Sequence, residues 1–193
     1  MKKLAKKTKV SSLKKGTLLI SKPFITNNEQ IKRSTILIVE HNEGISSVGF
    51  ILNKETDLPV FECLDDFPFI ENNLFFGGAN QTDLIHFLHK SPDIVDSIEI
   101  SPGIYWGGSV DQMKIYIESG KIEEKDIRFF AGYTIWENNQ LKEELLENKW
   151  ILSNGKKNLI FNDEPEKTWG QALEDIGSNL AVFANFPEEP SLN

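Results

Sequence analysis

The chain has one cysteine and no long apolar run, and each absence excludes a class of protein. Cys63 has no second cysteine to pair with, so an intramolecular disulfide is excluded and a reducing compartment is permitted. No apolar run approaches the roughly 18 residues that a membrane-spanning helix needs. The lysine-rich start also lacks the apolar stretch of a secretory signal. We therefore expect a cytoplasmic protein with no membrane partner.

The usual patterns of catalytic, cofactor and metal sites are missing too. No P-loop or GxGxxG motif accompanies the glycines. No histidine lies near Cys63 in the sequence, so we expect this cysteine to be buried and inert rather than catalytic. His86 and His89 are three residues apart, which on a strand directs their side chains to opposite faces. Since His41 is the only other histidine, we expect no structural metal and no cofactor.

Basic residues are scarce after the first fifteen positions. The chain has 21 Lys and Arg against 29 Asp and Glu, and seven of the lysines lie in residues 1–15. Residues 16–193 therefore keep 14 basic and 29 acidic residues, a formal charge of −15. We predict a flexible basic arm over residues 1–15 and a single domain over residues 16–193. The acidic body would repel a polyanion, so nucleic-acid contact is expected to be weak, non-specific and confined to the arm.

Three aromatic segments that contain or end in glycine are the most distinctive feature of the chain. They cover residues 74–78, 103–108 and 128–133. Bulky β-formers stopped by a Gly-Gly pair indicate a backbone that turns sharply or is closely approached by another group. We predict that Gly78 or Gly108 has a positive φ or contacts another backbone. The pairs Gly77-Gly78 and Gly107-Gly108 could also offer N–H groups to a phosphate, although tight turns or a close strand crossing are the competing interpretation.

The order of apolar segments predicts the fold class. Strands are expected at residues 16–21, 35–40, 48–52 and 84–89, with 42–44 as a hairpin turn and the second strand covered on both faces. A short helix and loop are expected over 55–73. Further helices are expected after Asn139, from Ser109, and from Thr168 through Phe183, the last two opened by capping boxes. Because helices and strands do not alternate regularly, we predict an α+β fold.

Several segments match one family signature in the same order. Residues 16–23, 33–42 and 49–54 resemble its opening, and residues 76–78, 88–89, 132–133 and 140–150 continue it. The chain is thus similar to the YqgE/AlgH family over residues 16–193. The resemblance implies a strongly bent mixed sheet that forms a partial barrel with packed helices, in proteins of poorly defined role. Some members are labelled transcriptional regulators, yet we find no helix-turn-helix, zinc-finger spacing or basic recognition helix here.

The sequence departs from the family pattern at two places. Ala79-Asn80 stands where the family has Pro-Val after the Gly-Gly pair, and residues 135–139 replace a Gly-Trp-Gly-x-Gly loop. The resemblance therefore implies nothing for this chain about properties that depend on that glycine loop.

The best candidate for a site lies at the end of a predicted central strand. His41 is a possible proton-transfer or ligand-binding group, although Glu40 beside it should point to the other face. The competing interpretation is hydrogen bonding that holds the strand end. Lys22, Arg33, Asn53 and Lys54 lie near the ends of neighbouring strands and could converge with His41 on an anionic ligand.

Three functions remain open from the sequence. The leading hypothesis is a non-enzymatic domain that binds a protein or small molecule through loops around His41, Gly78 and Gly107. The alternative is a hydrolase or transferase with His41 as general base and Gly-Gly N–H groups stabilising an oxyanion. It requires a pocket in which a second polar group lies within hydrogen-bond reach of His41. The third is a DNA-associated regulator that uses the lysine arm.

Overall fold

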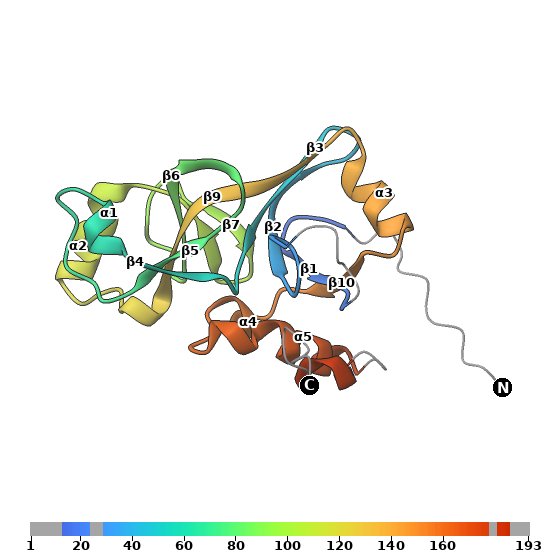
Figure 1. The fold of residues 1–193 in the computed structure, drawn as a ribbon. Coiled ribbons are helices and arrows are strands. Elements are labelled where there is room, and N and C mark those ends of the chain that lie inside the picture. The colour runs from blue at the N-terminus through green and yellow to red at the C-terminus, as the bar shows by residue number, and fades with distance from the viewer. Residues whose placement is uncertain (1–12, 24–28, 178–180, 186–193) are drawn as a thin grey trace.

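A curled mixed sheet forms a half-barrel that organises the single α+β domain (Figure 1). The computed structural model describes residues 13–23, 29–177 and 181–185. The strands are β1 Thr17–Ser21, β2 Thr35–Asn42, β3 Ser46–Ile51, β4 Glu55–Pro59, β5 Asn73–Phe76, β6 Asn80–His89, β7 Ile98–Ser101, β8 Ile104–Trp106, β9 Ile127–Glu137 and β10 Trp150–Asn154. The helices are α1 Val60–Cys63, α2 Val110–Glu118, α3 Gln140–Leu146, α4 Lys157–Ile160 and α5 Thr168–Ile176, with 3-10 turns η2 Glu124–Asp126, η3 Pro165–Lys167 and η4 Ala181–Asn185.

The long strand β9 joins the two halves of the sheet. The main path runs β10-β1-β2-β3-β9-β6-β8-β7, and β5 adds to β9 in parallel while its other edge pairs with β4. The end of β9 pairs with β3 from Thr134 onward, whereas its start pairs with β5 up to Ala131 and with β6 up to Tyr133. The exchange of partners within one strand bends the sheet, as the predicted partial barrel requires.

Gly78 sits where the two halves cross. A Cβ placed on Gly78 would lie 2.2 Å from the carbonyl carbon of Tyr133, so only glycine lets β9 approach this closely. Gly108 has a φ of +104° and would place a Cβ 2.7 Å from Ile94 Cγ2. The prediction that a positive φ or close backbone contact explains these glycines is confirmed.

The first half of the sheet consists of β10, β1, β2 and β3. Both of its faces are covered by other parts of the chain, as predicted for the second strand. Leu18 and Leu37 point to a core that contains Trp169 of α5, while Leu19 and Ile36 point to a core completed by α3 (Figure 1). A third core packs α1 and α2 at the other end of the molecule. Within the described ranges, no helix is long and apolar enough to cross a bilayer.

Helix α3 is fixed by one carboxylate. Glu144 Oε2 accepts hydrogen bonds from the indole nitrogens of Trp136, at 3.0 Å, and Trp150, at 2.6 Å. Leu13 packs against the same core. Residues 1–12 of the predicted basic arm lie outside the described residues.

Two helix ends differ from the prediction. Ser109 Oγ accepts from the Gln112 backbone as expected, but the Gln112 amide does not complete the capping box and instead accepts from the Val95 N–H at 2.8 Å. Helix α5 has Lys167 at its N-cap position, and the Thr168 hydroxyl accepts from the Asn162 side chain. This helix ends at Ile176 before Gly177, whose φ of +63° terminates it well short of Phe183.

Two other expectations need correction. Residues 55–73, expected as helix and loop, contain strand β4 as well as α1. Cys63, expected to be buried, is exposed at the end of α1, the short helix in which Val60 takes the inward position.

Candidate binding site beside helix α5

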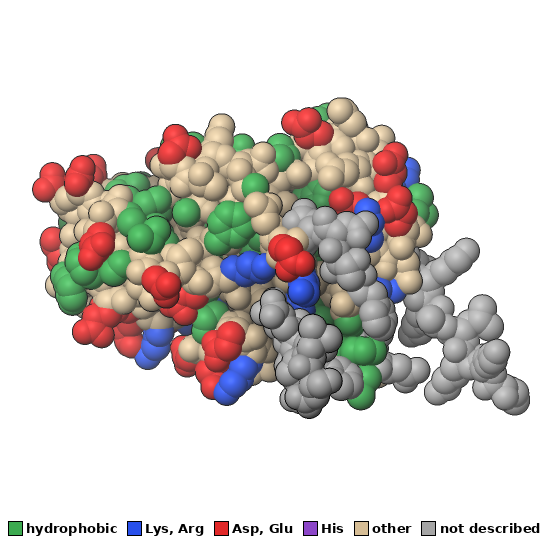
Figure 2. Space-filling model, in the orientation of Figure 1, with side chains coloured by type: hydrophobic (Ala, Val, Ile, Leu, Met, Phe, Trp, Pro, Cys, Tyr) green, Lys and Arg blue, Asp and Glu red, His purple; other side chains and the backbone are tan. Residues whose placement is uncertain are grey.

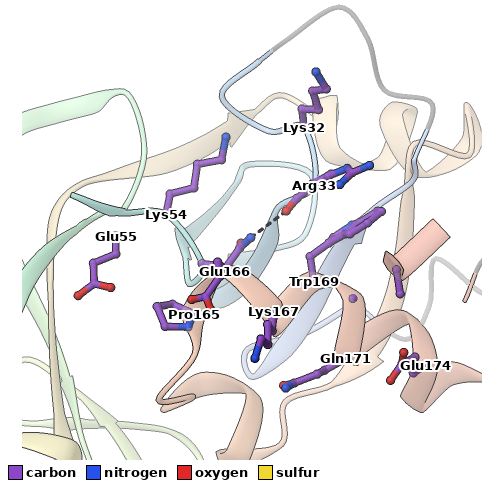
Figure 3. A pocket seen from close by; sticks show the side chains of 13 residues that line it. Lys32, Arg33, Lys54, Glu55, Pro165, Glu166, Lys167, Trp169, Gln171 and Glu174 are labelled. Atoms are coloured by element: carbon purple, nitrogen blue, oxygen red, sulfur yellow. Dashed lines mark hydrogen bonds between the residues drawn. The ribbon is translucent and has the colours of Figure 1, made fainter. Parts of the chain in front are cut away.

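A cavity lies between helix α5 and the turns at the ends of strands β2 and β3 (Figure 3). It has a volume of about 680 Å³. We call it the α5 cavity; its lining is Lys32, Arg33, Asn53, Lys54, Glu55, Pro165, Glu166, Lys167, Trp169, Gly170, Gln171, Glu174 and Ala184.

Asn53 builds the strand-side wall of the α5 cavity. Its Oδ1 accepts from the Thr35 N–H at 2.8 Å, and its Nδ2 donates to the Arg33 carbonyl oxygen at 2.8 Å (Figure 3). Arg33 has a φ of +49°, a left-handed conformation that is unusual for a residue with a side chain. The Asn53 amide therefore holds a strained residue in place at the cavity.

Trp169 builds the helix-side wall. It is buried, and its indole Nε1 donates to the Ser21 carbonyl oxygen at 2.8 Å, which ties α5 to the end of β1. The Arg33 guanidinium carbon lies 5.1 Å from the centre of the Trp169 ring, within the range of a cation–π contact. The indole thus orients the planar donor group of Arg33 at the cavity.

The charge of this cavity differs from that of the rest of the body. Its lining holds four cationic side chains and three carboxylates, whereas residues 16–193 carry a formal charge of −15. Lys32 pairs with Glu29 at 3.4 Å, Lys54 Nζ donates to the Glu29 carbonyl oxygen at 2.9 Å, and Lys167 pairs closely with Glu164. Acidic and basic groups therefore nearly balance at this cavity, whereas the rest of the body is strongly acidic.

The structure brings together only some of the residues predicted for a site. Arg33, Asn53 and Lys54 line the α5 cavity, but His41 does not. Lys22 is outside the lining, its backbone N–H donates to the Lys149 carbonyl, and partial burial lowers its pKa.

The paired glycines lie elsewhere in the sheet. The Gly77 N–H donates to Ala131 O at 2.9 Å, and the Gly107 N–H donates to Phe87 O at 3.0 Å. These two N–H groups are already engaged in the fold, and neither Gly78 nor Gly108 lines the α5 cavity or the cavity at His41.

His41 lines a second, smaller cavity of about 220 Å³. Its Nδ1 lies 2.8 Å from Ser47 Oγ on the neighbouring strand, so a polar group is within hydrogen-bond reach. Glu40 does not take part, because its Oε1 accepts from Asn42 at 2.7 Å. Asn139, which replaces a glycine of the family loop, lines this cavity and has a left-handed φ of +68°.

Arg128 was missed by sequence reasoning. Its guanidinium donates to the carbonyl oxygens of Leu52 at 3.1 Å, Ile160 at 2.8 Å and Asn162 at 2.7 Å, and lies 4.3 Å from the Phe75 ring. Burial lowers the pKa of Arg128 to about 10, although two nearby carboxylates act in the opposite direction. A single arginine inside the apolar run of residues 127–130 was the available signal.

His86 and His89 both belong to β6, as predicted. His86 lies against Phe50 and Tyr133, while His89 stacks on Tyr105 and its Nε2 donates to Gly107 O at 2.9 Å. Among the described residues, no three His, Cys, Asp or Glu side chains are grouped as a metal site would require.

Comparison with known proteins identifies relatives along nearly the whole chain. A family model described as AlgH-like matches residues 18–181. A UPF0301 protein from Chlorobaculum parvum is 37% identical over 182 residues, covering 94% of this chain and 96% of that protein. A UPF0301 protein from Bacteroides thetaiotaomicron is 38% identical over 180 residues, covering 93% and 91%.

Solved structures show the same architecture. The solution structure of the AlgH protein from Pseudomonas aeruginosa aligns with a TM-score of 0.71 at 25% identity, over 98% of this chain and 100% of that one. A crystal structure from Corynebacterium diphtheriae aligns with a TM-score of 0.75 at 19% identity, over 90% and 93%, and shares the fold. The family predicted from the sequence is therefore confirmed: the chain belongs to the AlgH-like family.

Proposed function

We propose that this protein is a non-enzymatic, cytoplasmic binding domain whose α5 cavity holds a small anionic molecule. The observation that carries the proposal is the pairing of Arg33 with two supports: Trp169 under its guanidinium and Asn53 on its backbone. Positioning a cation before the ligand arrives reduces the entropy that binding must overcome. Lys32 and Lys54 lie on the same wall (Figure 3).

The chemistry of the wall favours a carboxylate or phosphate group. A guanidinium presents a planar fork of N–H donors that matches either group, and ammonium groups add charge without fixed direction. The opposite wall offers the Gln171 amide and the carboxylates Glu166 and Glu174, which can accept hydrogen bonds from ligand hydroxyl or amino groups. A polar anion that also carries donor groups fits both walls.

Calorimetric titration with inorganic phosphate and with citrate, at constant ionic strength, tests the proposal. Arg33→Gln and Lys54→Gln should each weaken binding roughly tenfold, the cost of losing a hydrogen bond to a charged group. Lys142→Gln, an exposed lysine on α3, should leave binding unchanged. Failure of both anions to bind, or equal affinity in all variants, would refute the proposal.

A second candidate is a hydrolase or transferase at the His41 cavity. Ser47 Oγ within 2.8 Å of His41 Nδ1 supplies a hydroxyl and a base in the arrangement that nucleophilic catalysis uses. Against it, Ser47 is buried, Glu40 does not orient His41, and the Gly77 and Gly107 N–H groups are engaged elsewhere. We rank it below anion binding.

Labelling with a fluorophosphonate, which reacts with activated serines, separates the two candidates. Covalent labelling that is lost in Ser47→Ala and in His41→Gln, but kept in Ser46→Ala, would establish a reactive serine. The anion-binding proposal predicts no labelling of the wild-type protein.

A further inference from the structure

An exposed apolar face lies at the end of the molecule opposite α3, on β4, α1 and the loop that follows. Leu58, Phe61 and Phe69 are 54%, 40% and 68% exposed, and the two phenylalanine rings are 5.1 Å apart. We call these three side chains the Phe61 face. Figure 2 shows apolar and acidic side chains interspersed at this end of the molecule, where basic ones are few.

The fold does not require these side chains. Val60 and Ile70 are fully buried in the core beneath, and Phe67 packs edge-on against Phe129 with ring centres 5.4 Å apart. The inward residues therefore anchor the segment, while the adjacent rings of Phe61 and Phe69 stay partly exposed to water. Apolar patches of this kind, rimmed by polar groups, mark interaction sites on soluble proteins.

The charge around the Phe61 face selects the partner. Residues 55–85 contain seven acidic residues and no Lys, Arg or His. The carboxylates nearest in sequence are Asp57, Glu62, Asp65 and Asp66; all four are exposed, and none forms an ion pair with a described residue. Nucleic acids and anionic membranes would be repelled by this rim, whereas a cationic partner would be attracted.

We propose that the Phe61 face docks a basic segment of another protein, in which Lys or Arg side chains flank an aliphatic or aromatic anchor. The anchor would cover the two rings, which offer a large apolar contact at low entropic cost. The flanking cations would meet the acidic rim. We expect the charge pairs to determine which partner binds, and the apolar anchor to supply most of the binding free energy.

Cys63 makes the proposal directly measurable. It is the only cysteine of the chain and is exposed on α1, two residues from Phe61, so its alkylation rate, followed by intact-mass spectrometry, reports whether a bound peptide covers this helix. The probe is a twelve-residue amphipathic Lys/Leu peptide; a Glu/Leu peptide and a Lys/Ser peptide serve as controls. The Lys/Leu peptide should slow alkylation at least about fivefold near saturation, and the two controls should not.

Matched variants locate the binding. In anisotropy titrations, Phe61→Ser with Phe69→Ser, and separately Asp57→Asn with Glu62→Gln and Asp65→Asn, should weaken the Lys/Leu peptide about tenfold. Leu146→Ser with Glu143→Gln and Glu147→Gln changes similar exposed side chains on α3 and at its C-cap and should have no effect. Thermal melts confirm that each variant folds. The proposal is overturned if the Lys/Leu peptide does not bind, leaves Cys63 alkylation unchanged, binds no better than Lys/Ser, or is equally sensitive to the α3 variant.

Discussion

Arg128 donates a 2.8 Å hydrogen bond to the carbonyl oxygen of Ile160, and thereby joins the central strand to helix α4. The same guanidinium reaches Leu52, at the end of β3, and Asn162, which leads into α5. One buried cation thus holds the C-terminal helices, and with them one wall of the α5 cavity, against the sheet.

Replacing Arg128 with methionine should destabilise the protein by about 2–4 kcal/mol, because three inward carbonyl oxygens lose their donor. Lys125→Met, at a neighbouring exposed position, should change the free energy of unfolding by less than about 0.5 kcal/mol. Urea unfolding of both variants provides the comparison. If Arg128→Met were as stable as Lys125→Met, the three carbonyl oxygens would have found other donors, and Arg128 would not be what holds the helices.

Gly78 should be the least replaceable of the paired glycines. Gly78→Ala would force a Cβ into the Tyr133 backbone and should cost at least about 3 kcal/mol. Gly107 has a φ of +67° but open space around a Cβ, so Gly107→Ala should cost only the backbone strain, about 1–2 kcal/mol. Thermal and urea unfolding of the two variants compares the cost of the steric clash at Gly78 with the cost of backbone strain alone at Gly107. A smaller loss for Gly78→Ala would contradict the close crossing of the two sheet halves.

Acid should destabilise the protein through the half-buried His86 and the buried His89. Burial lowers the pKa of His86 and of His89 below the ordinary value of 6.5. The unfolded chain therefore takes up protons near pH 6.5 while the folded imidazoles stay neutral. Stability falls as the pH drops from about 7 toward the folded pKa values, by up to about 1.4 kcal/mol per pH unit for each histidine.

His86→Phe isolates one of these contributions. His86 lies among aromatic rings, and its buried Nε2 finds no hydrogen-bond partner among the described residues, so phenylalanine should fit the site. The variant should be at least as stable as the wild type at pH 7 and should lose less stability between pH 7 and pH 5. Unfolding curves at several pH values measure this slope, and an unchanged slope would contradict the assignment.

Any DNA binding should depend on the basic arm. The arm has seven lysines and the rest of the chain a formal charge of −15, so affinity should be weak, insensitive to sequence and steeply reduced by salt. Because Leu13 packs against the core, the informative truncation removes residues 1–12. Titration of labelled duplexes at two salt concentrations tests this. Sequence-selective binding by the truncated protein would instead favour the regulator hypothesis.

The sequence predicted the family, the sheet and most element positions because these depend on local patterns. The alternation of Leu18, Leu19, Leu37 and Ile38 between two cores is visible as a continuous apolar run. The predicted end of helix α5 was wrong. Apolar residues such as Phe183 continue the helical spacing, but the left-handed conformation of Gly177 stops the helix before them.

The candidate site was only partly predictable, because it depends on contacts between distant segments. Arg33 and Asn53 were recognised as polar residues at strand ends. Trp169 lies 136 positions from Arg33, and its helical spacing predicted only a core residue of the last helix. His41 lies on the same strand as residues close to the α5 cavity, yet the hairpin carries it to another cavity. No sequence pattern specifies which strand end α5 will cover.

The most direct test of anion binding uses the four tryptophan indole N–H signals in a nitrogen-15 correlation spectrum during titration with citrate. Trp169 lines the α5 cavity and Trp136 lines the His41 cavity, so the two sites report separately. We expect the Trp169 signal to shift with citrate in the wild type and not in Arg33→Gln, while the Trp136, Trp150 and Trp106 signals stay in place. A shift at Trp136 alone, or no shift at any indole, would contradict the assignment of the α5 cavity as the binding site.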